Sequence, residues 1–102
     1  MTGLVVYVAG PYSSDPAAGA NAAALAAHAL LDAGHYPVVP HLSLLLDLVR
    51  HRPYEEWLRH DFALLRRCDA LLRLPGHSPG ADREVQEAER LGVSVVHSIE
   101  EL

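Results

Sequence analysis

Residues 4 to 11 have the sequence Leu4-Val5-Val6-Tyr7-Val8-Ala9-Gly10-Pro11. A continuous run of β-branched and aromatic residues is typical of a strand that is buried on both faces, as in a parallel sheet. The glycine and proline that follow end the strand. This stretch therefore predicts the first strand of a parallel α/β sheet.

Working outward from this strand, the chain alternates between helical and strand patterns. Helix starts are marked by Asp15 and Ser78, each a capping residue followed by proline, and helix ends by Gly34 and Gly92. Ser98 with Glu101 resembles a capping box for a terminal turn. The expected strands are residues 36–40, 69–74 and 93–96, and the expected helices are residues 16–33, 43–50, 54–67 and 79–91.

This alternation implies right-handed crossovers and a parallel sheet that is covered on both sides. We expect one α/β domain over residues 1–102, Rossmann-like with the flavodoxin-like strand order, four to five strands and helices on both faces. The first and third strands should be central because they are the most apolar. The second, which contains Pro37 and Pro40, should lie at an edge.

Composition excludes several classes of function. The net charge is −5 and all basic residues are scattered arginines, so we expect no binding to a nucleic acid polymer. The N-terminus lacks a leader pattern and no apolar run approaches about 18 residues, so we expect no membrane association and a cytoplasmic location. A chain of 102 residues buries a small core, which favours a homodimer or a higher homo-oligomer.

The cysteine and the histidines do not suggest a metal or redox centre. The single cysteine, Cys68, begins an apolar run and is expected to be a buried, inert thiol. The seven histidines show no paired ligand spacing, and His60 should face away from its neighbour Asp61. Only His77 is a candidate contact to a ligand. We therefore expect neither a metal nor a cofactor.

Two loops are expected at the edge of the sheet where ligands bind. In open parallel sheets that edge lies beyond the carboxyl ends of the strands. The loops are residues 10–14 and 75–80, and both place small residues and hydroxyls before a helix N-terminus, where an anion is favoured. Most turns of this kind bind nothing, so the pattern alone stays ambiguous.

Two carboxylates could reach the same edge. Glu84 lies in the first two turns of the last long helix, whose positive end should keep it ionised, although an acid there can simply complement the dipole. Asp61 lies on an apolar helix face with Trp57 and Leu65, where an unpaired carboxylate is costly. The alternative for Asp61 is an ion pair with an arginine such as Arg59 or Arg66. Two carboxylates over one sugar are what glycosidic cleavage requires.

An ordered set of motifs then resembles a known family. The motifs are Tyr7-Val8-Ala9-Gly10-Pro11, Gly34-His35, Trp57 with Asp61, Cys68-Asp69-Ala70, Leu74-Pro75-Gly76 and Ser78-x-Gly80-Ala81-x-x-Glu84. They resemble the nucleoside 2-deoxyribosyltransferase superfamily over nearly the whole chain. The resemblance is closest to short bacterial and phage members and to the 2′-deoxynucleoside 5′-monophosphate N-hydrolases and cytidylate N-glycosidases.

The resemblance implies a role for each site residue. Glu84 would be the nucleophile, Asp61 the catalytic aspartate and Tyr7 a strand tyrosine near the nucleophile, unless Tyr7 only packs in the core. Ser78 would bind phosphate. The other substrate-binding candidates are Gly10, Pro11, Ser13, Gly80 and Trp57, although Trp57 could instead belong to the core.

The implied activity is hydrolysis of the N-glycosidic bond of a nucleoside 5′-monophosphate through a covalent glutamyl intermediate. The alternatives are base exchange by a deoxyribosyltransferase and a nucleotide-binding module without turnover. The sequence departs from the pattern at His77, where tryptophan is frequent, and at Pro40-His41, where Asn-Pro is frequent. Base recognition could therefore differ.

Overall fold

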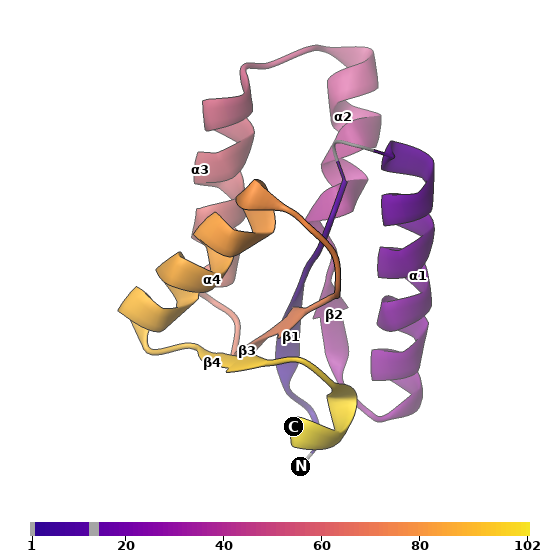
Figure 1. The fold of residues 1–102 in the computed structure, drawn as a ribbon, viewed down its shortest axis with the longest axis vertical. Coiled ribbons are helices and arrows are strands. Elements are labelled where there is room, and N and C mark those ends of the chain that lie inside the picture. The colour runs from indigo at the N-terminus through magenta and orange to yellow at the C-terminus, as the bar shows by residue number, and fades with distance from the viewer. Residues whose placement is uncertain (1, 13–14) are drawn as a thin grey trace.

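The computed structural model describes residues 2–12 and 15–102, and its centre is a parallel sheet. The strands are β1 (Val5–Ala9), β2 (Tyr36–Val38), β3 (Ala70–Arg73) and β4 (Ser94–Val96). Their order is β2-β1-β3-β4, and every neighbouring pair is parallel (Figure 1). The predicted fold class is confirmed, with the first and third strands in the centre and the second at an edge.

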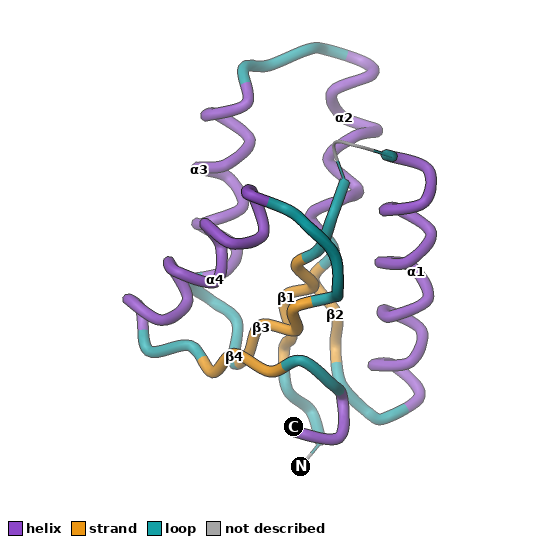
Figure 2. The backbone as a smooth tube through the Cα atoms, in the orientation of Figure 1, coloured by secondary structure: helices purple, strands orange, loops and turns teal. Residues whose placement is uncertain are grey.

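The helices follow the predicted order with small differences at their ends (Figure 2). They are α1 (Pro16–Asp32), α2 (Ser43–Val49), α3 (Tyr54–Leu65) and α4 (Pro79–Leu91), with short 3-10 turns η1 (Pro40–Leu42) and η2 (Ile99–Glu101). The second strand was expected to continue to Pro40, but its pairing with β1 stops at Val38 and Pro40 opens η1. Proline lacks the N–H that a longer ladder would need.

The capping signals act as the sequence predicts. The Asp15 side chain accepts a hydrogen bond from the Ala18 N–H at 3.1 Å, and Ser78 Oγ accepts one from the Ala81 N–H at 3.1 Å. Gly92 ends α4 with a φ of 77°, a left-handed conformation that favours glycine. The capping box of Ser98 and Glu101 is present. These local contacts fix where the helices begin and end.

Each face of the sheet carries its own apolar core. One core packs α1 on the sheet through residues such as Val8, Ala23 and Leu30. The other packs α3 and α4 on the opposite face through residues such as Leu65 and Ala88. The helices therefore cover both faces, as predicted.

The loops at the carboxyl edge pack tightly on each other. A Cβ on Gly76, whose φ is 113°, would lie 2.7 Å from Cγ of Pro11, and a Cβ on Gly19 would lie 2.3 Å from the Pro11 carbonyl oxygen. Glycine is thus required where α1 and the β3–α4 loop approach the β1–α1 loop. Beyond this edge rise α2 and the start of α3 (Figure 1). None of the helices in the described ranges is both long and apolar enough to cross a membrane.

Candidate active site

A cavity of about 600 Å³ opens at the carboxyl edge of the sheet. This volume is within the range of small-molecule sites, about 300–1,000 Å³. Its walls come from the β1–α1 loop, η1, α2, α3 and the start of α4. The lining residues are Gly10, Tyr12, Pro40, His41, Ser43, Leu44, Asp47, Tyr54, Trp57, Leu58, Asp61, His77, Ser78, Pro79, Gly80, Ala81, Arg83 and Glu84.

Glu84 and Tyr7 form a buried pair beneath this cavity. The hydroxyl of Tyr7 donates a hydrogen bond to Oε2 of Glu84, and both side chains are buried. The pKa of Glu84 is raised to about 7, mainly by burial and also by the charge of Asp61, while the Tyr7 hydrogen bond and the charge of Arg73 oppose the rise. The helix N-terminus was expected to keep Glu84 ionised, but burial outweighs it and brings the pKa of Glu84 close to neutral pH.

Asp61 reaches the same cavity from α3 without an arginine partner. Its Oδ1 is buried and makes no hydrogen bond within the described residues. Burial raises the pKa of Asp61 to about 7. Neither Arg59 nor Arg66 forms the alternative ion pair with it in the described part of the chain. An unpaired acid in a cavity wall has the properties of a proton donor.

His60 is adjacent to Asp61 on α3 but does not line the cavity. Nδ1 of His60 lies 3.5 Å from Oδ1 of Asp61, without the geometry of a hydrogen bond. The His60 ring also contacts Trp57 edge to face, with centroids 6.0 Å apart. His60 is exposed while Asp61 lines the cavity, as expected for adjacent residues on different faces of a helix.

Trp57 belongs to the cavity wall and not to the core. Its Nε1 donates a hydrogen bond of 2.7 Å to Oδ1 of Asp47 on α2. Asp47 also accepts from the Arg52 N–H at 2.9 Å and lies 3.1 Å from Nδ1 of His51. These contacts, led by the Arg52 N–H, lower the pKa of Asp47 to about 2. The carboxylate thereby ties α2 to α3.

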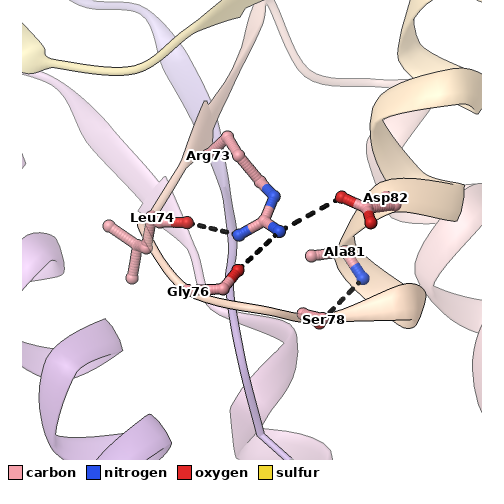
Figure 3. A network of polar contacts seen from close by, with 6 residues as sticks. All are labelled: Arg73, Leu74, Gly76, Ser78, Ala81 and Asp82. Atoms are coloured by element: carbon pink, nitrogen blue, oxygen red, sulfur yellow. Dashed lines mark hydrogen bonds and ion pairs between the residues drawn. The ribbon is translucent and has the colours of Figure 1, made fainter.

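Arg73 braces the loop that carries Ser78 (Figure 3). Its guanidinium donates to the carbonyl oxygen of Leu74, to that of Gly76 at 2.9 Å, and to Oδ1 of Asp82 at 3.1 Å. Its charge also lowers the pKa of Glu84. Sequence reasoning did not identify Arg73, because nothing local distinguishes a loop-bracing arginine from a solvated one.

Only some of the remaining residues predicted to contact substrate line the cavity. Gly10 and Gly80 line the cavity, as does the exposed His77. Pro11 packs against Gly76 and does not line the cavity, while Ser13 lies outside the described residues. Several further lining residues were not predicted substrate contacts, among them Tyr54 and Arg83, whereas His41 belongs to the Pro40-His41 departure that was expected to affect base recognition. Tyr54 and Arg83 lie outside the two expected loops, and nothing local in the sequence marks them as cavity residues.

Other reactive side chains do not extend the site. Cys68 is free and buried, and burial raises the pKa of its thiol to about 11. No cluster of three or more histidine, cysteine, aspartate or glutamate side chains suited to a metal occurs in the described ranges. The two carboxyl groups and the Tyr7 hydroxyl are the groups of this site whose pKa values are most clearly raised by burial.

Comparison with known proteins identifies the family of the chain. Residues 4–97 match the family described as Domain of unknown function (DUF4406). The chain belongs to that family. A search of curated proteins finds no match.

Two solved structures share the fold. A 2-deoxyribosyltransferase from the psychrotolerant bacterium Bacillus psychrosaccharolyticus superposes with a TM-score of 0.72 at 21% identity, covering 89% of this chain and 69% of that one. A 2-deoxyribosyltransferase from Leishmania mexicana superposes with a TM-score of 0.69 at 19% identity, covering 91% of this chain and 62% of that one. The predicted resemblance to the deoxyribosyltransferase fold is confirmed.

Proposed function

We propose that this protein cleaves the N-glycosidic bond of a nucleoside 5′-monophosphate by hydrolysis, with Glu84 as the nucleophile. The observation that carries the proposal is the meeting of two carboxyl groups, Glu84 and Asp61, in one cavity wall. They come from different helices, and the charge of Asp61 raises the pKa of Glu84. Two such groups are the minimum machinery for glycosidic cleavage with retention.

The proposed protonation states follow from the contacts. Both acids have a pKa raised to about 7 by burial, and two interacting acids ionise in sequence. The Tyr7 hydrogen bond and the charge of Arg73 favour ionisation of Glu84. Asp61 has no such support, so it holds the shared proton. Glu84 is then the nucleophile and Asp61 the acid.

The reaction proceeds in two steps. A carboxylate oxygen of Glu84 attacks C1′, the C1′–N bond breaks, and the bonding electrons leave with the base, which takes its proton from Asp61. Water then attacks C1′ of the ester while Asp61 accepts its proton. The products are the free base and the sugar phosphate, and Glu84 is regenerated.

Ser78 supports a phosphate-bearing substrate. Its oxygen accepts a hydrogen bond from the Ala81 N–H, which leaves its own O–H to donate to a phosphate oxygen. The Gly80 N–H lies in the same first turn of α4, beside the loop braced by Arg73. The proposal includes a small-molecule partner, no cofactor, a single catalytic domain over residues 1–102, a homo-oligomer and a cytoplasmic location.

The test is a screen of the purified protein against the common nucleosides and nucleoside monophosphates, with released base measured by chromatography. The wild type should release base from at least one monophosphate. Glu84→Gln, which keeps the size of the side chain, should lower release at least about a thousandfold while the circular dichroism spectrum is retained. Equal turnover by wild type and variant would refute Glu84 as nucleophile.

A second candidate is base exchange, and the fold shared with two 2-deoxyribosyltransferases favours it. It differs only in whether a second base or water opens the ester. Adding a free base to a reaction with an unphosphorylated deoxynucleoside distinguishes the two, because a transferase forms a new nucleoside whereas a hydrolase releases sugar. Nucleotide-induced thermal stabilisation without base release would instead indicate a binding module.

A further inference from the structure

His41 is a buried polar side chain whose polar atoms are unused. It lies in η1, is only 9% exposed and lines the cavity. Neither of its ring nitrogens has a hydrogen-bond partner among the described residues. Buried polar atoms are almost always paired, so an unpaired imidazole in a cavity wall points to a ligand that completes it.

The contacts of the ring define what that ligand must offer. Burial lowers the pKa of His41. The carbonyl groups of Pro11 and Gly10 are near enough to oppose this in part, but neither completes a hydrogen bond with the ring. The ring is therefore neutral at neutral pH. Carbonyl oxygens only accept hydrogen bonds, so they favour the tautomer whose N–H points toward them. The other nitrogen then carries a lone pair that faces no donor, and it requires a donor from the ligand.

The position of His41 in the cavity indicates which part of a nucleotide would supply the hydrogen-bond donor. His41 follows β2, Glu84 lies on the helix after β3, and β1 lies between these strands. In the proposed placement, phosphate lies at Ser78 at the start of α4 and C1′ at Glu84, and the base is the part of the nucleotide left to reach the β2 side of the cavity. The Tyr12 ring stands edge-on to His41, with centroids 5.7 Å apart and planes at 80°, and adds an aromatic surface there.

We propose that His41 binds the base of the substrate and selects bases with an exocyclic amino group over the matching bases with an oxo group. This inference rests on the proposed function, since it places the nucleotide by Glu84 and Ser78. The amino group donates to the open imidazole nitrogen, whereas an oxo group would set two acceptors against each other. A mismatch of this kind leaves buried polar groups unpaired, which is the strongest basis for discrimination.

The experiment compares matched nucleotide pairs that differ only in this group: CMP with UMP and AMP with IMP. The ratio of kcat/KM within each pair is measured for the wild type and for His41→Phe, which keeps a ring but has no nitrogen. Dividing the variant's ratio by that of the wild type removes the intrinsic difference between leaving bases. We expect the amino preference of the wild type to fall about tenfold or more in the variant. The circular dichroism spectrum checks that the variant is folded.

Two further variants sharpen the comparison. His28→Phe makes the same change at an exposed position on α1, outside the cavity, and should leave both ratios unchanged. His41→Gln serves if His41→Phe is too unstable to purify. Its amide can rotate to accept from an amino group or donate to an oxo group, so it should also lose the preference.

The outcomes separate this inference from the proposed function. An amino preference that is unchanged in both His41 variants overturns the inference. The inference is also overturned if the variants lose only the discrimination between nucleotide and nucleoside, because that result would place His41 at the phosphate. Absence of base release from every substrate overturns the proposed function alone. In that case, calorimetry can still test the inference by measuring how tightly the members of each nucleotide pair bind to Glu84→Gln and to the double variant Glu84→Gln with His41→Phe. Equal affinities for the amino and oxo members in both proteins would overturn the inference.

Discussion

The hydroxyl of Tyr7 on β1 donates a hydrogen bond to Oε2 of Glu84 on α4, a residue 77 positions later in the chain. The contact exists because β1 is central in the sheet and α4 packs across it. Burial and the charge of Asp61 raise the pKa of Glu84, while this hydrogen bond lowers it. Tyr7 therefore favours the ionised form of Glu84, as does the charge of Arg73.

Replacing Tyr7 with phenylalanine should move the pH dependence of the reaction. The variant loses the contact that lowers the pKa of Glu84, so the rise of kcat with pH, which follows ionisation of Glu84, should shift to higher pH. At neutral pH we expect kcat/KM to fall about ten- to hundredfold, the range for a hydrogen bond to a charged group. The measurement is a pH profile of base release.

The profile distinguishes this role from a structural one. A variant that is merely less well packed would lose activity equally at all pH values. Tyr36→Phe removes an exposed hydroxyl on β2 and should leave the profile unchanged. A Tyr7→Phe enzyme with the wild-type profile would show that Tyr7 only fills the core.

Replacing Asp61 with asparagine should stabilise the protein at alkaline pH. Burial raises the pKa of Asp61 to about 7, so the folded state binds more protons than the unfolded state between about pH 4 and 7. The stability of the wild type therefore falls as pH rises through this window. Above it, Asp61→Asn should be more stable by about 2 kcal/mol, a Tm higher by about 10 °C.

Thermal melts at pH 4 and pH 8 check this prediction. The gain should be present at pH 8 and absent at pH 4, where both forms are neutral, and base release should fall sharply. Asp32→Asn changes an exposed acid at the end of α1 and should show no gain at either pH. A gain of equal size at both pH values would mean that the charge of Asp61 is not its cause.

The sequence predicted the features that depend on neighbours in the chain. The caps at Asp15 and Ser78, the end of α4 at Gly92 and the apolar strands are each specified within a few residues, and they are confirmed. The ionisation of Glu84 was mispredicted, because the helix dipole is a local property whereas burial is set by elements that pack across the sheet. The unpaired ring of His41 could not be predicted for the same reason, since it depends on the carbonyl groups of a distant loop.

Replacing Ser78 with alanine should separate stability from substrate binding. Loss of the cap to the Ala81 N–H should cost about 1 kcal/mol in the free energy of unfolding. Loss of the hydroxyl should raise KM for a monophosphate about tenfold and leave KM for the corresponding nucleoside unchanged. Ser98→Ala removes a comparable cap on η2, outside the cavity lining, and should affect stability alone. Equal effects of Ser78→Ala on nucleotide and nucleoside would argue against a phosphate contact.

Replacing Gly19 with alanine should destabilise the protein, although alanine is normally the more favourable residue inside a helix. Inside a helix alanine is more favourable than glycine by about 1 kcal/mol. At position 19 of α1, however, the new Cβ would lie 2.3 Å from the Pro11 carbonyl oxygen and 3.0 Å from Cα of Tyr12, and neither backbone atom can rotate away. We expect a net loss of about 2 kcal/mol in urea denaturation. Gly10 and Tyr12 of the displaced loop belong to the cavity wall, so KM should rise as well.

Asn21→Ala is the control. It lies at an exposed position of the same helix and should stabilise the protein by about 0.5 kcal/mol. If Gly19→Ala proved as stable as Asn21→Ala, the close contact between α1 and the substrate-binding loop would not exist in solution.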